Sequence, residues 1–147
     1  MGLVSRAAVV WEGDLVSGKV TVSAVGSRAF QALAVSWASR TEAANGKTSP
    51  EELLAGAHAA CFAMAFSAGL ARAKTPPAKL EVSCAVTFDK VEAGWRVSSS
   101  ALEVKGSVPG LDQAGFDAAA QAAKDGCPIS QALKNNVQLS VKATLAG

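Results

Sequence analysis

Three cysteines and one histidine are the residues of this 147-residue chain whose types and positions suggest chemistry. Cys127 stands directly before Pro128, a residue that suits the first position of a helix. A thiol at a helix N-terminus faces unpaired N–H groups and the positive end of the dipole, which favour the thiolate. Cys61 lies in the middle of a long apolar segment and by itself looks like core. The two cysteines could form a dithiol pair, or Cys61 could serve packing alone.

The remaining cysteine and the histidine are interpreted as structural. Cys84 falls on the apolar face of a run with period two, where a free cysteine acts as a small core hydrophobe. His58 and Cys61 are three residues apart on one helix face, but zinc needs three or four such ligands and the chain has no second histidine. Glycine-rich phosphate loops are also absent from the sequence. We therefore expect no metal and no cofactor, and a buried His58 hydrogen-bonded to a carbonyl or a neighbouring side chain.

Composition restricts the class of protein. There are 14 basic and 12 acidic side chains and no tyrosine, which argues against a nucleic-acid partner. The length predicts a single domain over residues 1–147. Residues 1–14 lack the apolar core of a signal peptide, so we expect a cytoplasmic chain with reduced cysteines. Residues 53–70 carry no formal charge, yet their small side chains and charged flanks predict a fully buried central helix rather than a membrane span.

Hydrophobic periodicity predicts where the strands and helices lie. Strands grouped before and after helices, rather than alternating with them, favour an α+β fold with antiparallel sheets packed on the buried helix. The expected elements are strands near 8–11, 18–25 and 32–37, a helix from Pro50 to about Lys74 capped by Ser49, strands at 80–88 and 95–108, helices at 116–124 and 128–134, and a strand at 137–145.

Two cysteine-containing segments resemble the motifs of a known family. They are PEELLAGAHAACF at residues 50–62 and GCPISQ at residues 126–131. Both resemble the cysteine motifs of the OsmC/Ohr family, osmotically induced and organic-hydroperoxide-resistance thiol peroxidases of the oxidative stress response. The segments WEGD at 11–14 and DKVEAG at 89–94 resemble the OsmC branch. The resemblance covers nearly the whole chain in the right order.

This resemblance implies an architecture and a reaction. The architecture is an interlocked homodimer, in which curved antiparallel sheets wrap a long buried helix and two active sites lie at the subunit interface. Cys61 would be the peroxidatic thiolate that attacks an organic hydroperoxide and becomes a sulfenic acid. Cys127 would be the resolving thiol that converts it to a disulfide. An external dithiol, typically lipoyl-linked in this family, would reduce that disulfide. No membrane partner is expected.

The resemblance also implies a charged pair. Glu51 matches the family's motif carboxylate, which holds an arginine that activates the peroxidatic cysteine. Arg40 is the expected arginine because it shortly precedes the motif, and Arg28 is the weaker candidate. Physical chemistry supports such a partner: Cys61 lies about three turns into its helix, where apolar surroundings alone raise a thiol pKa. A guanidinium fixed by a carboxylate stabilises the thiolate and can bind peroxide oxygens.

Helix geometry adds an expectation about the dimer. Glu51 and Cys61 are ten residues apart, which corresponds to about 15 Å along a continuous helix. An arginine held by Glu51 cannot easily reach the thiol of its own chain. We therefore expect the pair to serve Cys61 of the partner chain across a two-fold axis.

Apolar residues around Cys61 favour substrates with an alkyl group over hydrogen peroxide. They are Leu53, Phe62, Met64 and Phe66. Two other functions remain open from the sequence: a redox sensor or stress-response protein whose oxidation alters a partner interface, and a non-catalytic module that binds hydrophobic ligands.

Overall fold

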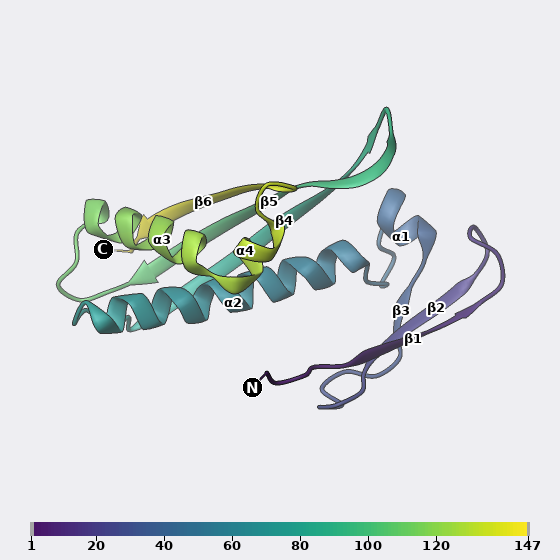
Figure 1. Ribbon diagram of the computed structural model, residues 1–147, viewed down its shortest axis with the longest axis horizontal. Helices are drawn as coiled ribbons and strands as arrows, with labels where there is room; N and C mark the ends of the chain where they lie inside the picture. Colours follow the sequence, from purple (N-terminus) through teal and green to yellow (C-terminus); the bar gives the residue numbers. More distant parts are fainter. Residues whose placement is uncertain (1, 147) are drawn as a thin grey trace. The chain divides into compact units, whose positions relative to one another are not determined.

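The computed structural model describes residues 2–146, and the chain divides into two compact units, one ending at Leu53 and the other beginning at Leu54. The first unit contains three antiparallel strands in the order β1-β2-β3 (Figure 1): β1 (Ala7–Glu12), β2 (Lys19–Ala24) and β3 (Leu33–Val35). Val22 of β2 is buried, whereas every residue of β1 is exposed. The meander expected from the β-branched runs is confirmed.

A short helix that the sequence analysis did not predict follows this sheet. Helix α1 (Trp37–Thr41) begins at Ser36, whose hydroxyl accepts a hydrogen bond from the Ser39 N–H, and the Ser39 hydroxyl accepts one from the Ser36 N–H. This reciprocal cap satisfies two backbone donors of a helix too short to be stable alone. Asn45 and Gly46 then turn the chain with φ values of 48° and 80°, as their types predict.

The long helix α2 (Pro50–Arg72) has the predicted start and end. The Ser49 hydroxyl accepts the Glu52 N–H at 3.0 Å, and the helix ends before Pro76. By length and composition α2 could cross a membrane, yet one of its faces packs into the second unit as a core helix. That face carries His58, Phe62, Phe66 and Leu70, spaced four residues apart. The expectation of burial on every side is wrong for the single chain, because Met64 on another face is 73% exposed.

The second unit contains a sheet in the order β4-β5-β6: β4 (Lys79–Val91), β5 (Gly94–Ser107) and β6 (Gln138–Leu145). β4 and β5 form the predicted antiparallel hairpin, but β6 pairs with β5 in parallel. The expectation of wholly antiparallel sheets is therefore wrong here. The reason is that α3 (Gln113–Gly126) and α4 (Pro128–Leu133) form a crossover, which returns the chain to the end of the sheet where β5 began.

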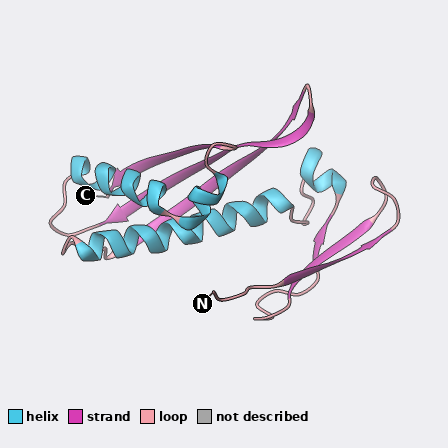
Figure 2. Cartoon of the chain, viewed as in Figure 1, coloured by secondary structure: helices cyan, strands magenta, loops and turns pink. Residues whose placement is uncertain are grey.

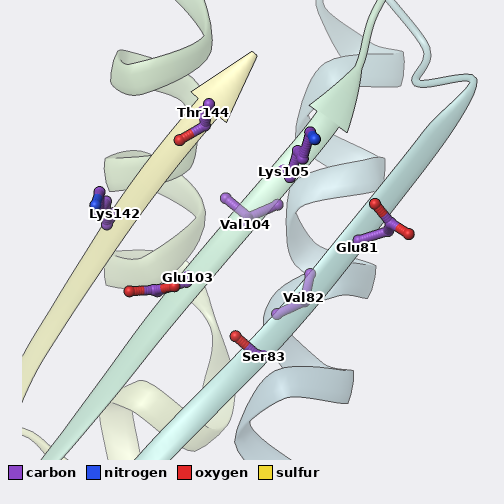
Figure 3. Close-up of a pocket in the computed structure, with 8 residues that line it drawn as sticks. All are labelled: Glu81, Val82, Ser83, Glu103, Val104, Lys105, Lys142 and Thr144. Atoms are coloured by element: carbon purple, nitrogen blue, oxygen red, sulfur yellow. The ribbon is translucent and has the colours of Figure 1, made fainter. Parts of the chain in front are cut away.

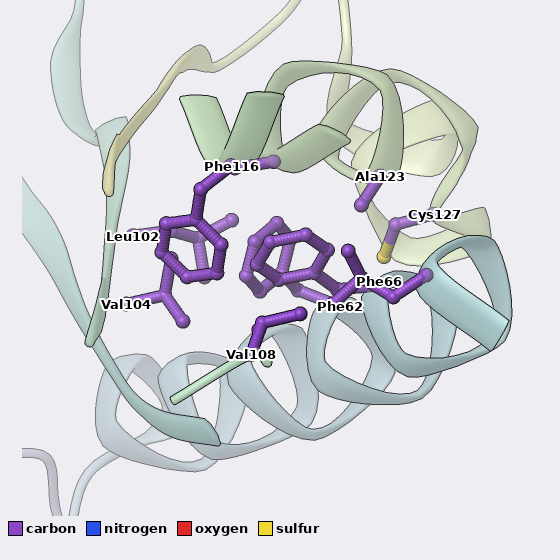
Figure 4. Packing of buried hydrophobic residues seen from close by; sticks show 10 residues of the cluster. Phe62, Phe66, Leu102, Val104, Val108, Phe116, Ala123 and Cys127 are labelled. Atoms are coloured by element: carbon purple, nitrogen blue, oxygen red, sulfur yellow. The ribbon is translucent and has the colours of Figure 1, made fainter. Parts of the chain in front are cut away.

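The core of this unit lies between its sheet and its helices. Helices α2, α3 and α4 gather on one side of the sheet (Figure 2), and inward residues of β5 alternate with outward Glu103 and Lys105. The ring of Phe66 lies 5.4 Å from that of Phe62 and 5.0 Å from that of Phe116, centroid to centroid (Figure 4). Truncating one such buried ring to alanine costs about 3–5 kcal/mol. This packing fixes the helix faces that carry the cysteines.

Candidate active site

Cys127 occupies the N-cap position of α4 and is fully buried at the edge of the aromatic cluster (Figure 4). Burial opposes ionisation of its thiol, but several hydrogen bonds outweigh that effect and lower its pKa below the usual value. The donors are the N–H and hydroxyl of Ser130, the thiol of Cys61 and the N–H of Ile129. The structure thus confirms that Cys127 lies at a helix N-terminus that favours thiolate.

Cys61 lies on the part of α2 that faces this helix end. It is half-buried, and its thiol is hydrogen-bonded to Cys127, so the two free thiols are in direct contact. Burial raises the pKa of Cys61, and the hydrogen bond to Cys127 raises it further, although the Ile129 N–H acts in the opposite direction. Cys61 therefore needs additional positive charge before it can act as a thiolate at neutral pH.

The first unit joins the two expected charged residues. Arg40 and Glu51 form a bidentate pair, with Nε to Oε2 at 3.1 Å and Nη2 to Oε1 at 2.6 Å. The Glu51 side chain is 8% exposed and that of Arg40 is 27% exposed. Both carboxylate oxygens of Glu51 bind Arg40, so Arg40 rather than Arg28 is the arginine that Glu51 holds. The Arg40 guanidinium also lies 5.8 Å from the ring centre of Trp37.

The ends of two helices set the position of this pair. Arg40 lies in the last turn of α1 and Glu51 in the first turn of α2. The Ser39 hydroxyl lies 2.8 Å from the Thr48 carbonyl oxygen, and the Thr48 N–H donates to the Ala34 carbonyl at 2.9 Å. These bonds hold the segment between the two helices against β3 and α1.

Two hollows differ in chemistry. A pocket of about 310 Å³ within the first unit has mostly apolar walls and Arg40 among its lining residues, which include Val9, Trp11, Leu15, Val20, Val22, Val35, Trp37 and Leu53. A hollow of about 420 Å³ on the outer face of the β4-β5-β6 sheet is lined largely by charged and polar side chains (Figure 3). The first suits an alkyl group beside a hydrogen-bonding cation. The second contains no nucleophilic thiol.

Similarity to known proteins identifies the family. Residues 43–142, which include both Cys61 and Cys127, match the family described as OsmC-like protein. The chain is 43% identical over 129 residues to peroxiredoxin OsmC of Escherichia coli (strain K12), covering 88% of this chain and 89% of that protein. The chain belongs to the OsmC-like family.

Other relatives agree with this membership of the OsmC-like family. An organic hydroperoxide resistance protein of Xanthomonas axonopodis pv. citri (strain 306) is 30% identical over 95 residues, which are 64% of this chain and 65% of that protein. The crystal structure of an OsmC-like protein from Mycoplasma pneumoniae has a TM-score of 0.76 at 14% identity and covers all of both chains. That likeness supports the fold: α+β, with two small sheets and a long central helix.

This OsmC-family chain also contains buried polar residues that the sequence analysis missed. His58 is a buried imidazole with side-chain partners, as predicted, but those partners are Ser100 at 2.6 Å and Ser130 at 2.7 Å. Cys84 is not simply a core hydrophobe, since its sulfur lies 3.2 Å from the Ser100 hydroxyl. One signal was available for Ser130, because the third residue of a helix faces the N-cap side chain. No sequence signal linked Ser100 to His58.

Proposed function

We propose that this chain reduces organic hydroperoxides to alcohols through Cys61 and Cys127. As an OsmC-family peroxiredoxin homologue, the chain is a thiol peroxidase. The observation that carries the mechanism is the direct contact between the two thiols, one half-buried on α2 and one at the N-cap of α4. A sulfenic acid formed on Cys61 would have the second sulfur within reach, without a large rearrangement.

The proposed reaction balances in two steps. The Cys61 thiolate attacks the terminal oxygen of R–O–OH, an S–O bond forms as the O–O bond breaks, and the leaving alkoxide takes a proton to give the alcohol. The Cys127 thiolate then attacks the Cys61 sulfenic sulfur. An S–S bond forms as the S–O bond breaks, and hydroxide leaves as water after protonation. An external dithiol, in lipoyl-linked form, returns two electrons and restores both thiols.

Arg40 supplies the positive charge that Cys61 lacks in this proposal. The carboxylate of Glu51 fixes the guanidinium through two hydrogen bonds, and a guanidinium fixed in this way can stabilise a thiolate and bind peroxide oxygens. The spacing of about 15 Å between Glu51 and Cys61 along α2 favours an Arg40–Glu51 pair that acts on the Cys61 of a partner chain. The exposure of Met64 on this apolar helix is consistent with burial in an interlocked homodimer.

The apolar pocket supports an organic substrate. Its volume of about 310 Å³ accommodates an alkyl or aryl group, and Arg40 on its wall provides donors for the peroxide end. Hydrogen peroxide has no apolar surface to bury and gains nothing from such walls. A cytoplasmic location, where dithiol reductants are available, fits this cycle.

One assay tests the proposal against its rivals. Consumption of cumene hydroperoxide and of hydrogen peroxide is followed with dihydrolipoamide as reductant, and thiols are counted before and after. Catalytic turnover with a clear preference for the organic peroxide and a loss of two thiols is expected. One slow oxidation without turnover would instead indicate a redox sensor. Unchanged thiols would indicate a hydrophobic-ligand module.

A further inference from the structure

Three polar side chains lie in the core of the second unit outside the proposed reaction. The His58 imidazole is 0% exposed, and each ring nitrogen contacts a buried hydroxyl: Nδ1 contacts Ser100 Oγ at 2.6 Å and Nε2 contacts Ser130 Oγ at 2.7 Å. Burying three polar groups costs free energy that apolar residues of the same size would not cost. Satisfied networks of this kind instead specify a particular arrangement of the core.

Both ends of this network reach a cysteine. Ser130 is the third residue of α4, where its side chain faces the N-cap residue Cys127 and its hydroxyl favours the Cys127 thiolate. The Ser100 hydroxyl lies 3.2 Å from the Cys84 sulfur. The result is a continuous hydrogen-bond network across β4, β5, α2 and α4, entirely within the second unit. Its members, in order, are Cys84, Ser100, His58, Ser130 and Cys127.

The number of protons available in this hydrogen-bond network restricts which group donates and which accepts in each hydrogen bond. Burial lowers the pKa of His58, so the ring is neutral at pH 7, with one N–H donor and one acceptor nitrogen. Each serine hydroxyl has one proton to donate. If Cys127 is a thiolate, Ser130 must donate to it and therefore accepts from Nε2–H.

Every hydrogen bond in the network reverses its donor and acceptor if Cys127 is a thiol that donates to Ser130. The Ser130 proton then points to Nε2, and Nδ1–H points to Ser100. The tautomer of His58 and the charge on Cys127 are thus linked through one hydroxyl.

We infer that His58 is a positioning residue for the second step of the reaction, because its Nε2–H tautomer turns the Ser130 hydroxyl onto the Cys127 thiolate. The inference rests on the proposed resolving role of Cys127. In that step the thiolate forms the S–S bond, the S–O bond of Cys61 breaks, and hydroxide leaves as water. His58 and Ser130 neither gain nor lose a proton overall; they keep the attacking sulfur charged and aimed. On reduction of the disulfide, the same hydroxyl stabilises the returning thiolate.

Other titratable groups lie near this hydrogen-bond network and contribute to the pH dependence of the disulfide step. Cys61 contacts Cys127 from α2, and Cys84 contacts the chain from β4. Lys124, Asp125 and Lys134 line a hollow of about 360 Å³ with Ser130. A comparison between variants at one position keeps all of these groups constant.

The test separates the two chemical steps. Reduced protein is mixed with one equivalent of cumene hydroperoxide and quenched at intervals, and mass spectrometry measures the dimedone-trapped Cys61 sulfenic acid and the Cys61–Cys127 disulfide. Ser130→Ala should form sulfenic acid at the normal rate but form the disulfide about tenfold more slowly near neutral pH, because loss of the hydroxyl raises the pKa of Cys127 and reduces the fraction of thiolate. Ser130→Thr keeps a hydroxyl and should restore the rate. Ser83→Ala, the same change at an exposed position of β4, should alter neither step.

His58→Gln supplies the second arm. It should slow the disulfide step as Ser130→Ala does, and the double variant should be no slower than Ser130→Ala, because both changes remove one interaction. If His58→Gln does not fold, the Ser130→Ala and Ser130→Thr comparison decides. A normal disulfide rate in Ser130→Ala or in folded His58→Gln, or equal loss in Ser130→Thr, would overturn the inference.

Cys127→Ser distinguishes this failure from that of the proposed function. If Cys127→Ser still turns over normally, the resolving role itself is wrong. If Cys127→Ser accumulates sulfenic acid while Ser130→Ala resolves normally, only the role of His58 is wrong.

Discussion

The first unit holds its charged pair at the ends of two helices, with the Arg40 side chain partly exposed, whereas the second unit holds its two thiols against a packed core. Arg40 and Glu51 come from the ends of two helices and keep some contact with solvent. Cys61 and Cys127 are set by the same packing that buries Phe66. A fully buried ion pair costs desolvation energy, while thiols tolerate burial. Changes to the charged pair should therefore lower activity through the loss of charge and lower stability by leaving one partner unpaired, whereas changes around the thiols should act through the packing of the core.

Replacement of the peroxidatic sulfur has the largest expected effect. Cys61→Ser should abolish peroxide reduction, since a serine alkoxide is inaccessible at neutral pH. Peroxide consumption with excess dithiol measures this. Cys127→Ser should complete one turnover and stop with an added oxygen on Cys61, seen by mass spectrometry. Hydrogen bonds also lower the pKa of Cys127, so the rival assignment is testable: an oxygen added to Cys127 in Cys61→Ser would reverse the two roles.

Loss of the guanidinium comes next. Arg40→Met should lower activity at pH 7 about 100-fold, and it should also lower thermal stability, because the buried Glu51 carboxylate loses its partner. Without the cation, burial keeps the pKa of Cys61 raised, and thiolate falls tenfold for each pH unit below that pKa. Part of the activity should therefore return as pH rises. Arg28→Met, the same change at an exposed arginine, should have a normal pH profile; a deficit there and not in Arg40→Met would transfer the role to Arg28.

The dimer arrangement predicts complementation between inactive chains. Cys61→Ser and Glu51→Ala subunits are mixed and allowed to exchange. If the charged pair serves the partner's thiol, one site of the hybrid carries both lesions and the other is intact, so up to half of the wild-type activity per hybrid should return. If each chain serves itself, every hybrid site has one lesion. No recovery after verified exchange would contradict the partner arrangement.

A smaller effect concerns stability and pH in the core of the second unit. His58 is the chain's single histidine, and burial lowers its pKa. The unfolded chain therefore binds a proton at a higher pH than the folded chain. The free energy of unfolding should fall as pH drops below about 6.5, by up to about 1.4 kcal/mol per pH unit. Urea unfolding at pH 7.5 and 5.5 measures this, and the slope attributable to His58 should disappear in His58→Gln. An unchanged slope would contradict the assignment.

The same contrast explains what the sequence could and could not predict. In the second unit, the period-two strands and the Cys127 N-cap are local signals, and both appear as expected. The parallel pairing of β6 was missed because strand direction depends on the path of the whole crossover rather than on local pattern.

In the first unit, helix α1 is too short to give a periodic hydrophobic pattern, so the sequence does not predict the helix that carries Arg40. The Arg40–Glu51 pair was expected from the family motif and not from periodicity. Contacts such as that between His58 and Ser100 join residues far apart in the sequence, and no rule of residue spacing predicts them.

Replacement of the third cysteine, Cys84, has the smallest expected effect on activity. It serves as a control for the roles assigned to the other two cysteines of the second unit. Cys84→Ala should leave both chemical steps unchanged, although the Cys84 sulfur contacts Ser100 at the far end of the buried chain. The reason is that the Ser100 hydroxyl can still donate to Nδ1 of His58, so the Nε2–H tautomer and the Ser130 hydroxyl keep their orientation. Loss of the half-buried sulfur should cost about 1 kcal/mol of unfolding free energy, measured by urea unfolding. A tenfold loss of activity in a folded Cys84→Ala protein would mean that Cys84 takes part in the thiol chemistry, and that two cysteines do not account for it.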